Sequence, residues 1–201
     1  MSKKDIFETI DFLQLWEDKR FLGAEFLTWL WLSSEVSREF DLSGGQGQVW
    51  VTFESSIKLE SGQGAAKRSV SCQTPAEGSG EGGEWAEALT AITRYKKVIG
   101  GKLRIQFEDR EWLLSLPADT LSPKQVKITA APGSGEKEND DLAQIGLFLD
   151  RTSLIMELNS IIEDLLKTFL DLRLSSKWES EELPRLRGWI RRWGQEAAGE
   201  E

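Results

Sequence analysis

Apolar residues crowd most densely between positions 21 and 35, where the chain reads FLGAEFLTWLWLSSE. Leucine and aromatic residues recur there at three- and four-residue steps, yet Leu27 and Trp31 fall on the opposite side of the predicted helix. A helix that is apolar nearly all round is normally buried on several sides. A run of roughly 15 residues is also too short to span a bilayer. The pattern therefore predicts the central packing helix of a soluble domain.

A second helical pattern precedes this run, over Asp5–Asp18, with a short break at Lys19–Arg20. Farther along, apolar and polar residues alternate with the period of a half-buried strand. The predicted strands are Gln48–Glu60, with a change of phase at Ser55-Ser56, a weaker one at Ala66–Thr74, and a short one at Val126–Thr129.

The clearest alternation predicts a β-hairpin, with Lys102–Phe107 and Glu111–Leu116 flanking a turn at Glu108-Asp109-Arg110. Before it, apolar residues from Trp85 onward follow helical spacing. This spacing predicts an inserted helix that ends near Gly100-Gly101, because paired glycines are common helix breakers.

Helical spacing returns over Leu142–Leu174, a length that leaves room for a break near Asp150–Ser153. A last helix is predicted over Leu183–Ala197, with Pro184 in its first turn. The fold class is α+β: an antiparallel sheet of four to five strands with N-terminal helices, one inserted helix and a C-terminal helical segment. We expect an α+β domain at 1–131, a linker at 132–141, and a helical segment at 142–201 that packs on the same domain or on a partner.

The composition limits which catalytic and metal sites the chain can form. With 201 residues, 39% of them hydrophobic, the chain can bury a sizeable core and is not wholly disordered. It has no histidine and one cysteine, Cys72, which excludes His-dependent nucleophile pairs, His/Cys zinc sites and an internal disulfide. A carboxylate-only magnesium site stays open, but no constellation points to one. We therefore expect a protein that is not an enzyme and has no cofactor and no metal.

The N-terminal residues MSKKDIFETIDF lack the continuous apolar region of a signal peptide, which predicts a cytoplasmic protein without a membrane partner. The net charge is −9 and the isoelectric point is near 4.8, which argues against an isolated nucleic-acid binder. The basic residues nevertheless gather in two islands. The first contains Arg94, Lys96, Lys97, Lys102 and Arg104, and the second contains Arg185, Arg187, Arg191 and Arg192.

Each island has two interpretations. Lysines and arginines at a helix end and on an adjacent strand can contact phosphates of a duplex. The first island can also complement the C-terminal end of the inserted helix, and from the residue chemistry alone this is the interpretation we favour. The second lies beside Trp189 and Trp193, so its helix either contacts a nucleic acid, an acidic partner or a membrane surface, or docks its tryptophans on the core with solvated arginines. The docked helix is the interpretation we favour.

A glycine-rich segment, Gly78 to Gly83, formally matches the G-x-G-x-x-G pattern of dinucleotide sites. Such a site presents backbone N–H groups to pyrophosphate within a βαβ unit. Here Glu77, Glu81 and Glu84 crowd the segment and would repel phosphate, and the next strand belongs to an antiparallel hairpin. The segment is interpreted as a loop.

Several segments, in order, resemble the C-terminal half of the RdgC recombination-associated family. They are FLGAEFLTWLWLSSE at 21–35, the strand-rich segment from Val49 to Cys72, EALTAITRYKKVIGGKLRI at 87–105, WLLSLPADTLS at 112–122 followed by Val126-Lys127, and FLDLRLSSKW at 169–178. The resemblance implies a DNA-binding protein without sequence specificity, which forms a ring-shaped dimer around duplex DNA and restrains the recombinase that assembles there.

The chain departs from that family in its acidity and in lacking the family's N-terminal half, so a ring would be incomplete or completed by a companion chain. Tyr95 also stands where the family's Gly-Lys-Lys-type step has glycine. The leading hypothesis is a nonenzymatic RdgC-like module that binds double-stranded DNA or acts in a recombination-associated complex, which would place it at the nucleoid. The alternative is an acidic protein–protein adaptor or oligomer subunit, for which the surplus of tryptophan is typical.

Overall fold

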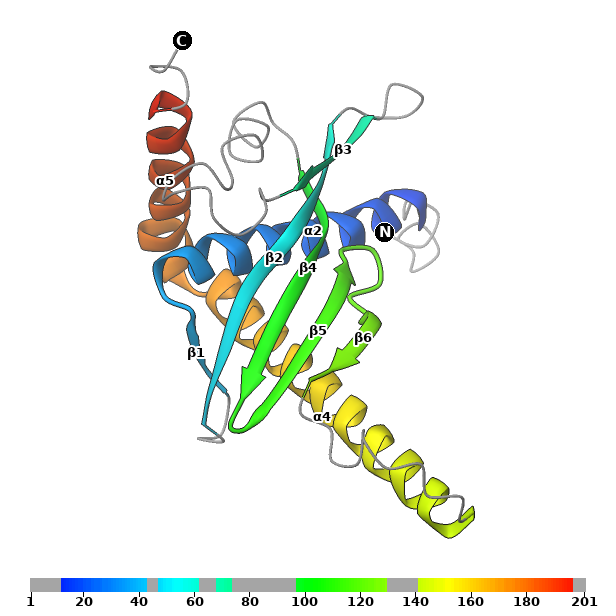
Figure 1. Cartoon of the computed structure of the whole chain (residues 1–201). Coiled ribbons are helices and arrows are strands. Elements are labelled where there is room, and N and C mark those ends of the chain that lie inside the picture. Colours follow the sequence, from blue (N-terminus) through cyan, green and yellow to red (C-terminus); the bar gives the residue numbers. More distant parts are fainter. Residues whose placement is uncertain (1–11, 43–46, 62–67, 74–96, 130–140, 197–201) are drawn as a thin grey trace, which may run out of the picture.

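The computed structural model describes residues 12–42, 47–61, 68–73, 97–129 and 141–196 (Figure 1). These residues have the α+β fold class expected from the sequence. The helical elements are α2 (Phe12–Val36), α4 (Asp141–Leu174), a π-helical turn η3 (Trp178–Glu182) and α5 (Leu183–Glu196). The strands are β1 (Glu39–Asp41), β2 (Gln48–Ser61), β3 (Arg68–Gln73), β4 (Lys97–Phe107), β5 (Arg110–Pro117) and β6 (Lys124–Ile128).

The strands form one antiparallel sheet in the order β1-β2-β4-β5-β6, and β3 pairs with β2 on the same edge as β1. Across the sheet, Val51 lies opposite Ile105, and Ile105 opposite Trp112. All three side chains are fully buried. Because side chains alternate between the two faces of a strand, these rows define the core face of the sheet.

The helices α2 and α4 cross this core face (Figure 1). Helix α2 is buried on several sides, as predicted. Trp31 packs against Phe53 of β2, with ring centroids 6.5 Å apart, and against Trp189 of α5 at 5.9 Å. Phe169 of α4 lies 5.5 Å from Trp29 of α2. One helix therefore joins the sheet to both C-terminal helices.

The hairpin is confirmed. Strands β4 and β5 pair from Gly100↔Pro117 to Phe107↔Arg110, and Glu108 adopts a left-handed backbone conformation at the turn. The change of phase at Ser55-Ser56 is also confirmed, since the β2–β4 register shifts between Phe53 and Ile57. Strand β1 was not expected, because three residues are too few to reveal an alternation. It makes six strands where four to five were predicted.

Three helix boundaries differ from the predictions. Helix α2 continues without a break through Lys19–Arg20, and α4 is one helix with no break at Asp150–Ser153. The inserted helix was predicted to end near Gly100-Gly101, but β4 already begins at Lys97. The remainder of that helix, the first residues of the N-terminal helix, the glycine-rich segment and most of the predicted linker lie outside the described residues.

Gly101 explains why the glycine pair was misinterpreted. A Cβ atom at this position would come within 2.7 Å of the Phe53 ring. Strands β2 and β4 therefore need glycine here for close packing of the aromatic ring, not to end a helix. The buried Val98, which pairs with Leu59, extends the same strand toward its N-terminus.

At Gly23, helix α2 lies as close to the backbone that follows β5 as Gly101 lies to the Phe53 ring. A Cβ atom there would come within 2.0 Å of the carbonyl oxygen of Ala118. We predict that Gly23→Ala lowers the free energy of unfolding by about 1–3 kcal/mol, because helix and backbone must separate. Urea denaturation measures this change.

The matched control is Gly188→Ala in α5, where the added methyl group meets no atom within 4 Å. Alanine is the better helix former, so this variant should be more stable than the wild type by about 0.5–1 kcal/mol. If both variants change the stability equally, the close contact of α2 with Ala118 is not the cause.

Candidate nucleic-acid interface

The structure divides the first basic island. Arg94 and Lys96 lie outside the described residues. Lys97, Lys102 and Arg104 lie on β4, where Lys97 and Lys102 are exposed. Lys102 and Arg104 belong to the face of the sheet that carries no helix among the described elements, here called the open face (Figure 1).

Arg104 is engaged by two carboxylates. Its Nε donates to Glu54 of β2 at 2.6 Å, and its Nη1 donates to Glu111 of β5 at 3.1 Å. The hydrogen bond to Glu54 is the main reason why the pKa of Arg104 is raised above its ordinary value. Because two carboxylates bind its one guanidinium, Arg104 links β2, β4 and β5 on the open face and adds no surplus positive charge.

The second island lies elsewhere. Helix α5 packs on α2, so its arginines lie on the helical side of the molecule (Figure 1). Arg185 is bound by Glu182, with 2.7 Å between Nη2 and Oε2, and also donates to Ser33 at 3.1 Å. Arg187 and Arg191 are exposed, and the side chain of Arg192 lies outside the described part. The structure therefore does not bring the two islands together on one surface.

Other lysines join Lys102 on the open face. Lys58 alternates with the buried Ile57 and Leu59, so it points away from the core. In β6, Lys127 lies opposite Leu113 and Lys124 opposite Ser115, two residues of β5 that alternate with its buried positions. We call these four exposed residues the lysine face: Lys58, Lys102, Lys124 and Lys127.

Among the described residues, nothing occupies the ammonium groups of the lysine face. None of the four forms an ion pair with another residue of the described ranges. Of these four lysines, only Lys102 belongs to a basic island predicted from the sequence. The alternation around Lys58 carried a signal for its orientation, but the grouping depends on cross-strand register, which a single sequence does not reveal.

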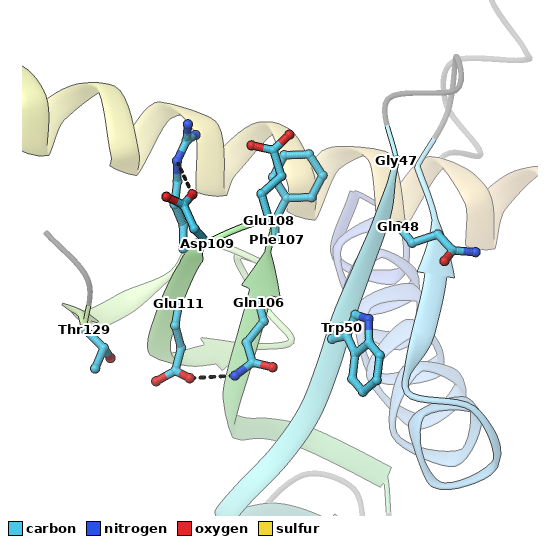
Figure 2. Close-up of a pocket in the computed structure, with 10 residues that line it drawn as sticks. Gly47, Gln48, Trp50, Gln106, Phe107, Glu108, Asp109, Glu111 and Thr129 are labelled. Atoms are coloured by element: carbon cyan, nitrogen blue, oxygen red, sulfur yellow. Dashed lines mark hydrogen bonds and ion pairs between the residues drawn. The ribbon is translucent and has the colours of Figure 1, made fainter.

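At the β4–β5 turn, the open face carries more acidic than basic side chains, because Glu108, Asp109 and Glu111 lie there with Arg110. A shallow hollow of about 710 Å³ lies there, lined by Trp50, Gln106, Glu111 and the turn residues Glu108 and Asp109, among others. Figure 2 shows Gln106 and Glu111 pointing toward each other, with 2.6 Å between amide nitrogen and carboxylate. Trp50 is 46% exposed beside them. Carboxylates at this end would repel phosphate.

Within the described ranges, no group of three or more potential metal ligands is clustered, and no helix is long and apolar enough to cross a membrane.

The chain matches no model of a protein family, no curated protein and no solved structure. The resemblance to the RdgC family therefore stays a prediction.

The network around Glu111 predicts a pH dependence of stability. The hydrogen bond from Gln106 is the main cause that lowers the pKa of Glu111 below its ordinary value of 4.5, with further contributions from Thr129 and Arg104. A carboxyl group with a lowered pKa in the folded state stabilises the fold above its unfolded pKa, and this stabilisation is lost as the pH falls through the folded value.

We expect the free energy of unfolding, measured with urea between about pH 6 and pH 3, to decrease less steeply on acidification in Glu111→Gln than in the wild type. Glu108→Gln at the exposed turn of the same hairpin changes the net charge equally and should keep the steeper, wild-type dependence. Identical curves for Glu111→Gln and the wild type would show that the network does not stabilise the fold.

Proposed function

We propose that this chain is a nonenzymatic, RdgC-like module that binds DNA without sequence specificity through its lysine face. The single observation that carries the proposal is the gathering of Lys58, Lys102, Lys124 and Lys127 from three strands on one face, without ion-pair partners among the described residues. Phosphate contacts by flexible ammonium groups provide affinity without reading bases, as nonspecific binding requires.

The dimensions of the lysine face suit a nucleic-acid backbone. Strands β2 and β6 are separated by three strand spacings, which is roughly 14 Å. Along the strands, Lys58 lies opposite Gly100, two residues from Lys102. The four charges therefore spread over an area comparable with several base pairs, each of which adds about 3.4 Å to a duplex.

The acidity of the whole chain does not oppose this assignment. The segment from Lys97 to Ile128 has six basic and four acidic residues, so its formal charge is +2 in a chain of −9. Many of the described acids lie on α4 and η3, on the helical side of the sheet. A packed layer of about 10 Å separates the two sides, while salt screens exposed charges beyond about 8 Å at physiological ionic strength.

We expect labelled duplex DNA to bind at about 20 mM salt with a dissociation constant in the micromolar range or tighter, and to bind far more weakly at about 150 mM. The double variant Lys102→Glu/Lys127→Glu should lose at least about tenfold in affinity at low salt. Its salt dependence should also be shallower, because each lost phosphate contact removes about 0.9 from the log–log slope. Fluorescence anisotropy measures both quantities.

The matched control is Arg187→Glu/Arg191→Glu, which changes the net charge by the same amount on the exposed side of α5. We expect this variant to keep most of the affinity. Equal losses in the two variants would mean that net charge, and not the lysine face, governs binding. A loss confined to the α5 variant would transfer the site to the second island, and no binding at low salt would overturn the proposal.

A second candidate function is that of an oligomer subunit or protein–protein adaptor. The observation that favours it is apolar: five large side chains on the first half of α4 are between 41% and 68% exposed. Exposed apolar surface of this extent is typical of a contact site for another protein.

A further inference from the structure

The first half of α4, from Asp141 to Met156, extends beyond the edge of the sheet (Figure 1) and is here called the arm. Its exposed apolar side chains are Ile145 (55%), Phe148 (68%), Leu149 (59%), Ile155 (41%) and Met156 (68%). The second half of the same helix supplies the fully or almost fully buried Leu158, Ile161, Ile162, Leu165 and Phe169. One helix therefore carries two different apolar surfaces.

The two surfaces lie on different faces of α4. The exposed residues follow the steps i, i+3, i+4, i+10 and i+11, which place them on one stripe of a helix. Continued along the helix, this stripe first meets the polar Asn159 and the exposed Glu163, and only then the half-buried Leu166 and Leu170, which pack against the core. Polar residues therefore interrupt the exposed apolar stripe after the arm, and the fully buried side chains of the second half lie on another face.

Thr152 lies within the stripe but does not interrupt its apolar character. Its hydroxyl group donates to the carbonyl oxygen of Phe148 at 2.8 Å, so the polar group is satisfied within the helix. The methyl group of Thr152 then remains for contact with a neighbour. The two charged residues at the centre of the arm, Asp150 and Arg151, fall outside the stripe by helical geometry.

We propose that the arm binds the arm of a second copy of this chain, antiparallel, about a two-fold axis near residue 150. In this register Ile145 lies opposite Ile155 of the other copy, and Phe148 lies opposite Thr152. Each bulky phenyl ring then meets a small side chain, and the same pairs recur on both sides of the axis, as an isologous contact requires.

The alternatives fit the stripe less well. A parallel pair in register would place phenyl against phenyl and threonine against threonine, leaving a poorly filled layer at Thr152. It would also bring both globular bodies to the same end of the paired arms. A charged partner helix would find no opposite charge among the described side chains of the stripe from Ile145 to Met156, whereas a second copy presents an equally apolar surface.

The size of the stripe is compatible with a dimer. Its five large side chains together expose on the order of 600 Å² per copy. In an interface of standard size, each partner buries about 800 Å². The inference does not depend on DNA binding. It extends the second candidate function by naming the partner and the contact.

The first test is the mass of the purified chain by light scattering or sedimentation. The wild type should have twice the 22.7 kDa of one chain, and Phe148→Glu should have the mass of the monomer, because it places two carboxylates in the contact. The matched control is Leu174→Glu, which changes a residue that is 84% exposed on the same helix outside the arm, and it should remain dimeric.

The second test determines the direction of pairing with single cysteines in a Cys72→Ser background, since Cys72 is the only native cysteine. In the proposed register the two copies of Thr152 are separated by about 6 Å along the helix axis, and those of Glu163 by about 39 Å. A short bismaleimide should therefore link Thr152→Cys into covalent dimers and leave Glu163→Cys monomeric. In a parallel pair both variants would be linked.

Each outcome decides between the possibilities. A dimer lost in Phe148→Glu, kept in Leu174→Glu and linked only through position 152 supports the inference. An oligomer that survives Phe148→Glu overturns the arm contact but leaves the oligomer function standing. A wild-type monomer overturns self-association, and equal linking at positions 152 and 163 overturns the antiparallel arrangement.

Discussion

The burial of α2 on opposite sides is the constraint on which the other elements depend. Its aromatic residues face both the sheet and the C-terminal helices: Trp31 contacts Phe53 and Trp189, while Phe26 and Trp29 contact Phe169. Burial of such large rings contributes more than their area alone, because the ring pairs add their own attraction. Without α2, the core face of the sheet and the inner faces of α4 and α5 would lose their common partner.

This arrangement places every described helix on one side of the sheet and leaves the other side to mainly polar residues, with Trp50 and Leu113 among them. The charged residues on this side fall into two groups. Arg104 holds Glu54 and Glu111 together, whereas the four lysines of the lysine face form no ion pairs with the described residues. Because Arg104 binds the nearby carboxylates, we expect the four ammonium groups to give a locally positive potential in a chain whose net charge is −9. The proposed DNA contact follows from this separation.

Local periodicity was sufficient to predict the fold class, the hairpin and the last helix, because each has a clear repeat and recognisable turn residues. It failed where a distant contact decides the local conformation. Gly100-Gly101 continues a strand because Phe53, far away in the chain, occupies the space beside it. Similarly, the carboxylate that neutralises Arg104 comes from Glu54, fifty residues earlier. Of the lysine face, only Lys102 could be identified before the strand register was known.

The central claim is that DNA contacts the lysine face, and lysine footprinting tests it most directly. The chain is acetylated with and without duplex DNA at low salt, and the modification of each lysine is measured by mass spectrometry. The account predicts that DNA protects Lys58, Lys102, Lys124 and Lys127, while the exposed Lys167 and Lys177 on the helical elements react as before. Equal protection of both groups, or protection of Lys167 and Lys177 alone, would contradict it.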